Sequence, residues 1–173
     1  KNTTGVILIA KVDEAHWRLA RQFENRTIQK TYMALTHGIP PLQADVIDMP
    51  IGQDRYVREK QAVRKIESGG RSAVTMYQVL ETFETPPGQT HFQFQASTFA
   101  NDRHYKTPGG KFSLVKLSPK TGRTHQLRVH LSHIGVPIVG DTMYGGQQIV
   151  TGGENAFTFA RQALHAAEIT FTH

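Results

Sequence analysis

The sequence predicts an α+β domain whose core is a mixed, largely antiparallel sheet flanked by helices. Short stretches with apolar residues at every second position recur along the chain and are typical of strands. The stretches with helical spacing are isolated and do not alternate regularly with strands, as they would in a parallel α/β fold. A chain of 173 residues is long enough to bury a core and short enough to form one domain.

The first predicted elements are a strand, a helix and a second strand. Residues 5–10 (GVILIA) form a short apolar run that indicates a buried strand. Asp13 is a favourable N-cap, and apolar residues follow it at helical spacing: Ala15, Leu19, Ala20 and Phe23. The latter part of residues 26–35 (RTIQKTYMAL) predicts a strand, because apolar side chains fall at even spacing: Ile28, Tyr32 and Ala34. It is ended by His37, Gly38 and the pair Pro40-Pro41.

The middle of the chain predicts extended segments joined by loops. Residues 44–78 are interpreted as extended pieces around an exposed loop in which positive charge concentrates: Arg55, Arg58, Lys60, Arg64, Lys65 and Arg71. Residues 72–84 and 91–99 are predicted strands, and the polar residues 101–110 are a predicted loop. Residues 111–117 (KFSLVKL) alternate imperfectly but still predict a strand.

A second helix is predicted from Arg123 to Ile134, after a turn over residues 119–122. Gly135 stands where the C′ residue belongs, and Pro137 lies just beyond it. One buried stripe is expected along this helix, because apolar residues recur at i, i+4 and i+7: Leu127, Leu131 and Ile134.

Arg123 lies four residues before Leu127, so it extends the buried stripe if the helix has begun by that point. An inward-facing guanidinium is costly unless it meets an acceptor, and the closest acidic residue downstream is Asp141. Three interpretations remain open at this stage. Arg123 pairs with a carboxylate that is distant in sequence, binds an anionic ligand, or caps backbone carbonyls as a structural arginine.

Composition excludes several classes of protein. Cysteine is absent, which rules out a disulfide scaffold, a thiolate metal site and a cysteine nucleophile, and is compatible with a reducing compartment such as the cytoplasm. No apolar run approaches the length of a membrane span, and the first residues do not resemble a signal peptide. Lys and Arg number 20 against 14 acidic residues, and the formal charge of +6 favours a polyanionic partner such as RNA or DNA.

The predicted second helix carries three histidines, which raise the hypothesis of a metal-dependent hydrolase: His125, His130 and His133. His130 and His133 share a helical face, as two zinc ligands would. The spacing is not His-Glu-x-x-His, however, and no acidic residue lies on this helix to act as a base or a third ligand. Roles in packing or RNA contact are therefore favoured, and no metal is expected.

Four segments resemble the motifs of one known family in the same order. Residues 121–141 (TGRTHQLRVHLSHIGVPIVGD) closely resemble the signature of the RluA family of RNA pseudouridine synthases. Residues 26–38 (RTIQKTYMALTHG) are similar to that family's Lys-x-Tyr motif, and residues 161–166 (RQALHA) to its C-terminal hydrophobic motif. The opening KNTTGVILIAK resembles the segment just after the family's His-Arg-Leu-Asp, whose aspartate is catalytic. The resemblance implies a pseudouridine synthase catalytic domain over residues 1–173, incomplete at its N-terminus, with the aspartate expected just before Lys1.

The resemblance also implies roles for individual residues. Arg123 is expected to pair with the aspartate, and Tyr32 to stack on the flipped uracil and to assist proton removal. Leu164 is expected to line the pocket, and Lys30, on the same strand face as Tyr32, to meet phosphate or base. Additional RNA contacts are assigned to four basic residues: Arg55, Arg58, Lys60 and Arg128. Without the resemblance, Tyr32 and Leu164 can be interpreted as ordinary core residues. The basic residues can then be interpreted as solvated surface residues.

The implied reaction converts specific uridines of structured RNA, ribosomal or transfer, to pseudouridine without a cofactor or metal. A monomeric, cytoplasmic protein with no membrane association is expected. The alternative is a non-catalytic RNA-binding protein that retains the fold, which the residue before Lys1 would distinguish, since only an aspartate there permits the chemistry.

Overall fold

The computed structural model describes residues 2–84, 90–93, 110–146, 148–151 and 159–173. Its main sheet has six strands in the order β1-β10-β2-β8-β6-β3, and it confirms the predicted α+β fold with a mixed, largely antiparallel sheet. Only the pairing of β1 with β10 is parallel among these neighbours. In sheet order the strands are β1 (Thr4–Gly5), β10 (Leu164–Thr170), β2 (Gln29–His37), β8 (Lys111–Pro119), β6 (Val74–Glu84) and β3 (Ala44–Asp48).

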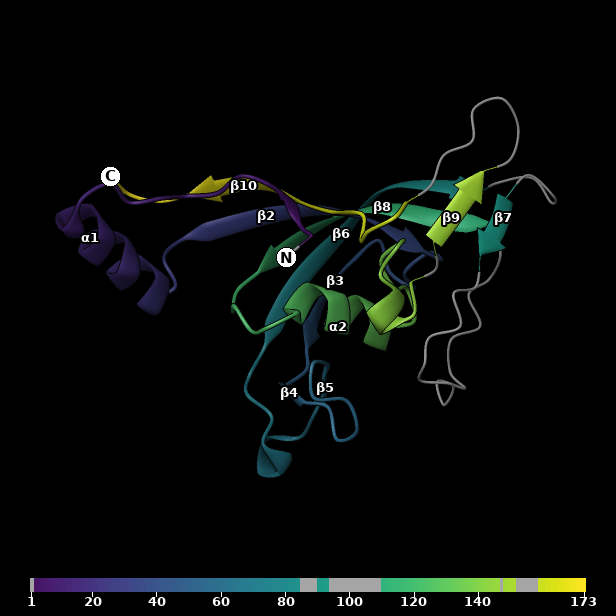
Figure 1. The fold of residues 1–173 in the computed structure, drawn as a ribbon, viewed down its shortest axis with the longest axis horizontal. Coiled ribbons are helices and arrows are strands. Elements are labelled where there is room, and N and C mark those ends of the chain that lie inside the picture. The colour runs from purple at the N-terminus through teal and green to yellow at the C-terminus, as the bar shows by residue number, and fades with distance from the viewer. Residues whose placement is uncertain (1, 85–89, 94–109, 147, 152–158) are drawn as a thin grey trace.

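The remaining strands that the structure describes form two smaller sheets of two strands each. A hairpin pairs β4 (Ile51–Gln53) with β5 (Gln61–Val63), and β7 (Thr90–Gln93) pairs with β9 (Gln148–Thr151). In Figure 1 the β4–β5 hairpin projects away from the main sheet on the side where α2 (Gln126–His133) lies. Short 3₁₀ turns are formed by η1 (Ile66–Ser68) and η2 (Thr142–Tyr144).

The strands predicted over residues 72–84 and 111–117, and over the latter part of 26–35, are confirmed as β6, β8 and β2. Of the strand predicted over 91–99, residues 91–93 belong to β7, and residues 94–99 lie outside the described residues. The loop predicted over 101–110 also lies outside them, apart from Gly110.

Helix α2 covers the centre of the sheet and ends as predicted. Leu127 and Leu131 are buried and Ile134 is partly buried in the main core, against strand residues such as Val115 and Leu117. After the helix, Gly135 takes a φ of 82°, its N–H donates to Ser132 O, and the Val136 N–H donates to Leu131 O. These two bonds form a Schellman motif with Gly135 at C′.

The start of this helix was predicted wrongly. The helix begins at Gln126 rather than Arg123, and His125 precedes it with a φ of 56°, in the left-handed region. Arg123 therefore belongs to the connection between β8 and α2 and does not extend the buried stripe. The physical reason is a set of hydrogen bonds with strand β6, in which the Thr121 hydroxyl accepts from the Val74 N–H and the Gln126 amide donates to Val74 and Thr75; these bonds hold residues 121–125 in a non-helical path.

The N-terminal segment also departs from prediction. Residues 5–10 were expected to form a buried strand, but only Thr4 and Gly5 pair with β10, and Ile7 is 81% exposed. Gly5 permits this close pairing, because a Cβ there would clash with the Ala166 carbonyl oxygen. The predicted helix is confirmed as α1 (Asp13–Glu24), but Val12 is its N-cap residue, and no side chain caps it.

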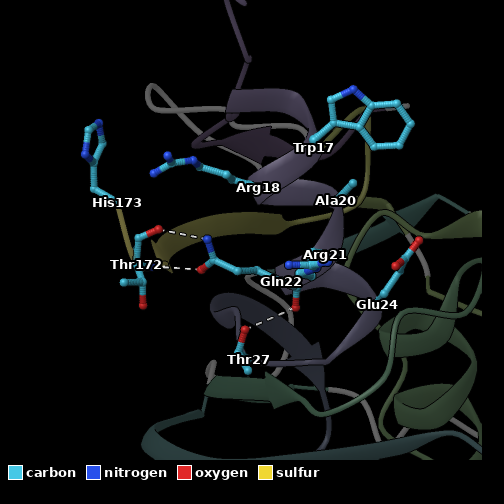
Figure 2. A pocket seen from close by; sticks show the side chains of 9 residues that line it. All are labelled: Trp17, Arg18, Ala20, Arg21, Gln22, Glu24, Thr27, Thr172 and His173. Carbon is cyan, nitrogen blue, oxygen red and sulfur yellow. Dashed lines mark hydrogen bonds between the residues drawn. The ribbon is translucent and has the colours of Figure 1, made fainter. Parts of the chain in front are cut away.

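Helix α1 lies at one end of the molecule, beside the ends of β2 and β10 (Figure 1). Between α1 and the end of β10 is a cavity of about 760 Å³, where the Gln22 side chain bonds the backbone of Thr172 (Figure 2). No described residue of α1 is buried. None of the helices in the described part of the chain is long and apolar enough to cross a membrane.

Candidate active site

A second cavity, of about 190 Å³, gathers residues that the sequence motifs place far apart. It lies where β2 and β10 meet the connection between β8 and α2. Its wall includes five of the predicted site residues: Lys30, Tyr32, Arg123, Arg128 and Leu164. Thr3 also lines it, so the start of the sequence reaches the same place.

Strand β2 presents two polar side chains to this pocket. Tyr32 pairs with Leu117 of β8 and with Ala166 of β10, which fixes the backbone of Tyr32 between two neighbouring strands. Burial raises the pKa of the Tyr32 phenol and lowers the pKa of the Lys30 ammonium, because each charged form loses hydration. The Tyr32 hydroxyl thus keeps its proton at neutral pH.

Arg123 stands at the pocket wall, partly exposed rather than buried. Its backbone N–H donates to Gln126 Oε1 at 3.0 Å, and its Nε donates to the Ser72 carbonyl at 3.0 Å. Among the described residues, none of the ion pairs involves Arg123. Burial, then Arg71, then Arg26 lower the pKa of its guanidinium. The arginine thus has cationic neighbours and one carbonyl contact through Nε, and no hydrogen bond or ion pair of its Nη atoms is found among the described residues.

Arg128 has an interaction that the sequence did not predict. Its Nε and Nη2 donate to the two carboxylate oxygens of Asp141, each at 2.7 Å. The Asp141 side chain is only 1% exposed, and the Arg128 side chain 12%. The guanidinium also lies over the Tyr144 ring, 4.6 Å from its centroid. Arg128 borders the pocket, but its charge is already paired.

The basic residues Arg55, Arg58 and Lys60 do not line the pocket. They lie on the β4–β5 hairpin, in the loop between its strands, where Arg55 and Arg58 are exposed. Asp54 shapes this loop, because its Oδ1 accepts hydrogen bonds from the backbone N–H groups of two following residues, Tyr56 and Val57.

The hairpin is tied to the pocket through Tyr144. The Gln61 N–H donates to the Tyr144 hydroxyl at 2.9 Å, and the same hydroxyl lies 2.8 Å from His125 Nδ1, at the pocket wall. Burial, then Arg128, lower the pKa of His125, which favours its neutral form. Sequence reasoning missed Tyr144, since nothing in its local pattern signals contacts with residues 61 and 125.

The histidines of α2 have separate structural surroundings. Both ring nitrogens of His130 are engaged, Nδ1 with Thr75 Oγ1 and Nε2 with the Met49 carbonyl, each at 2.9 Å. His133 is exposed. In the described ranges, no three His, Asp or Glu side chains gather as metal ligands would.

Comparisons with known proteins agree on one family. A family profile described as RNA pseudouridylate synthase matches residues 1–133. Over the whole chain, identity is 34% to the uncharacterized RNA pseudouridine synthase YlyB of Bacillus subtilis and 37% to the ribosomal large subunit pseudouridine synthase D of Pseudomonas aeruginosa. These alignments cover 45% and 47% of the two relatives, so the chain spans about half the length of the curated relatives it matches.

A solved structure supports the same family. The human RNA pseudouridylate synthase domain containing 1 superimposes with a TM-score of 0.64 and is 27% identical in sequence. The superposition covers 91% of this chain and 55% of the human chain.

Proposed function

Because the chain belongs to the RNA pseudouridylate synthase family, we propose that the complete protein isomerises uridine to pseudouridine within RNA. The reaction breaks the bond between N1 of uracil and C1′ of the ribose, and forms one between C5 and C1′. The observation that supports it most is the single pocket that brings together Lys30, Tyr32, Arg123 and Leu164, which come from three separated motifs.

In this proposal an aspartate just ahead of Lys1 supplies the reacting carboxylate. Arg123 pairs with it and keeps it ionised and correctly aimed, since a nearby guanidinium lowers the pKa of a carboxyl group. A carboxylate is needed both for nucleophilic addition and for elimination to a glycal. Thr3 supports the proposal, because it lines the Arg123 pocket only two residues after Lys1.

Tyr32 and Leu164 form the part of the site that receives the uracil. A uridine within RNA structure hides its glycosidic bond, so it must rotate out of the stack and regain stacking in the pocket. The partly buried ring of Tyr32 offers that surface, and Lys30, which lines the same pocket, is proposed to meet phosphate or base. No metal or cofactor is assigned a role, and the protein is proposed to act as a monomer in the cytoplasm.

The direct test is conversion of RNA by the full-length protein. We expect pseudouridine in ribosomal or transfer RNA transcripts after incubation with enzyme and EDTA, mapped by carbodiimide modification and primer extension. The name of the Pseudomonas aeruginosa relative makes large-subunit ribosomal RNA the first substrate to try. RNA binding without conversion of any transcript would instead favour a binding protein that retains the fold.

Arg58→Ala is expected to weaken RNA binding without changing the rate of the bound complex. Arg58 is exposed on the β4–β5 hairpin and outside the pocket. Loss of one phosphate contact should flatten the dependence of log K on log[salt] by about 0.7–0.9. The measurement is a fluorescence titration at several salt concentrations.

Arg21→Ala is the matched control, because it removes the same charge from an exposed position on α1, which lies at one end of the molecule and apart from the hairpin (Figure 1). Its slope should equal that of the unchanged protein. Equal slopes for Arg58→Ala and the unchanged protein would show that Arg58 does not contact phosphate.

A further inference from the structure

We infer that Gln126, the first residue of α2, is a positioning residue that sets the place of Arg123 in the pocket. The inference rests on the proposed function, because it concerns the arginine assigned to the reacting carboxylate. Gln126 is 4% exposed and its side-chain amide makes hydrogen bonds in two directions. Toward the pocket, Oε1 accepts from the Arg123 N–H at 3.0 Å and from the Thr121 hydroxyl at 2.7 Å.

Away from the pocket, the same amide is anchored to strand β6. Gln126 Nε2 donates to the Val74 carbonyl at 2.9 Å and to Thr75 Oγ1 at 3.0 Å. The orientation of the amide is therefore fixed by its partners. A backbone N–H can only donate, so the atom facing Arg123 must be the oxygen, and a carbonyl can only accept, so the atom facing Val74 must be the nitrogen.

A further chain of hydrogen bonds fixes the anchor itself. His130 Nε2 donates to the Met49 carbonyl, which leaves Nδ1 as an acceptor for the Thr75 hydroxyl. Thr75 Oγ1 then accepts from Gln126. Burial lowers the pKa of His130, which favours the neutral ring that this pattern requires. Each partner in the chain is satisfied in only one arrangement, so Gln126 has one orientation.

The connection that carries Arg123 depends on this amide. Thr121 accepts from the Val74 N–H and donates to Gln126, so both ends of the segment from 121 to 123 are tied to Gln126 or to β6. The Arg123 side chain adds one bond of its own, from Nε to the Ser72 carbonyl. Removing the amide of Gln126 leaves the Arg123 N–H without this acceptor, and the Arg123 carbonyl bonded only to the Gln126 backbone N–H. We therefore expect the guanidinium of Arg123 to shift relative to Tyr32.

The test uses Gln126→Met in the full-length protein, since methionine has a similar length and no hydrogen-bonding amide. We expect kcat to fall by up to about 100-fold, the cost of misplacing a reacting group by about 1 Å, with little change in KM. In ¹⁵N NMR spectra, hydrogen exchange of the Arg123 amide should accelerate. Rates are compared at temperatures at which all variants are folded, so that loss of stability alone leaves kcat unchanged.

Gln22→Met is the matched control. Gln22 makes two side-chain hydrogen bonds to the backbone of Thr172, beside α1 (Figure 2), and it does not line the active-site pocket. Its loss should leave kcat and the Arg123 amide unchanged. Should Gln126→Met fail to fold, the isosteric Thr75→Val removes only the hydroxyl behind Gln126, and should lower kcat about 3- to 10-fold, the cost of one hydrogen bond.

The outcomes separate this inference from the proposed function. Absence of pseudouridine with the unchanged protein contradicts the proposed function. An active unchanged protein together with a folded Gln126→Met variant of undiminished kcat overturns the positioning role, as does undiminished kcat in Thr75→Val.

Discussion

Arg123→Ala in the full-length protein is expected to lower kcat by about 100-fold or more, the typical cost of removing one preorganised electrostatic contact from an active site. Arg123 borders the pocket with Tyr32, and the neighbouring charges that act on it come from Arg71 and Arg26. Without the guanidinium, the carboxylate of the proposed aspartate loses its counter-charge and is no longer held in its orientation. Single-turnover conversion of radiolabelled RNA measures the rate, and a filter-binding titration measures affinity.

RNA affinity should change far less than the rate, because the exposed cations of the β4–β5 hairpin remain. Arg123→Lys is the informative companion variant, since it keeps the charge but not the planar fork that holds a carboxylate in two bonds. Arg123→Lys should bind RNA as tightly as the unchanged protein, and its kcat should lie between those of Arg123→Ala and the unchanged protein. Equal losses of affinity and rate in Arg123→Ala would assign the arginine to RNA binding instead.

Arg128→Ala is expected to lower the free energy of unfolding by about 3 kcal/mol, near the lower end of the cost of breaking a buried ion pair. The substitution leaves the carboxylate of Asp141, 1% exposed, without its guanidinium. It also removes the cation that packs over the Tyr144 ring. Urea denaturation followed by circular dichroism measures the difference at neutral pH.

An exposed ion pair gives the matched control. Arg18→Ala breaks the bond to Glu14, in which both side chains are at least 70% exposed, and should cost about 0.5 kcal/mol or less. The double substitution Arg128→Met with Asp141→Asn removes both charges and should regain most of the stability lost in Arg128→Ala. A variant Arg128→Ala that is as stable as the unchanged protein but binds RNA weakly would contradict this structural role and support the predicted role of Arg128 in substrate binding.

The elements that sequence reasoning predicted well are those whose determinants are local. Leu127 and Leu131 at helical spacing and Gly135 at the C′ position define the end of α2 without help from other strands. The start of α2 depends instead on contacts between Gln126 and residues 74 and 75, about fifty positions away. A pattern read along the chain does not contain that information, so the helix was predicted to start three residues too early.

Burial was the least predictable property. The apolar run of residues 5–10 has the composition of a core strand, yet Val6, Ile7 and Ile9 are all more than half exposed. An apolar composition shows that a segment favours burial. Burial itself requires a second element to pack against the segment. Within the described residues, this run meets β10 only at its start, where Gly5 pairs with Ala166 and the Val6 N–H donates to the Ala166 carbonyl.

The candidate site was predictable to the extent that its residues lie in recognisable motifs. Lys30, Tyr32, Arg123 and Leu164 were expected together and line one pocket. The groups that support them were not expected, since Gln126, His125 and Tyr144 act through partners distant in sequence. The roles of the predicted residues in catalysis and RNA contact stay predictions until the variants are measured.

The Tyr144 hydroxyl is shared by the β5 backbone and by His125, so one phenol joins the hairpin that carries exposed cations to the turn that carries Arg123. Displacing either the hairpin or this turn would break one of the two hydrogen bonds of the Tyr144 hydroxyl or would move Tyr144 with it. Under the proposed function, an RNA strand that displaces the hairpin would therefore also strain the contact between Tyr144 and His125, at the wall of the pocket.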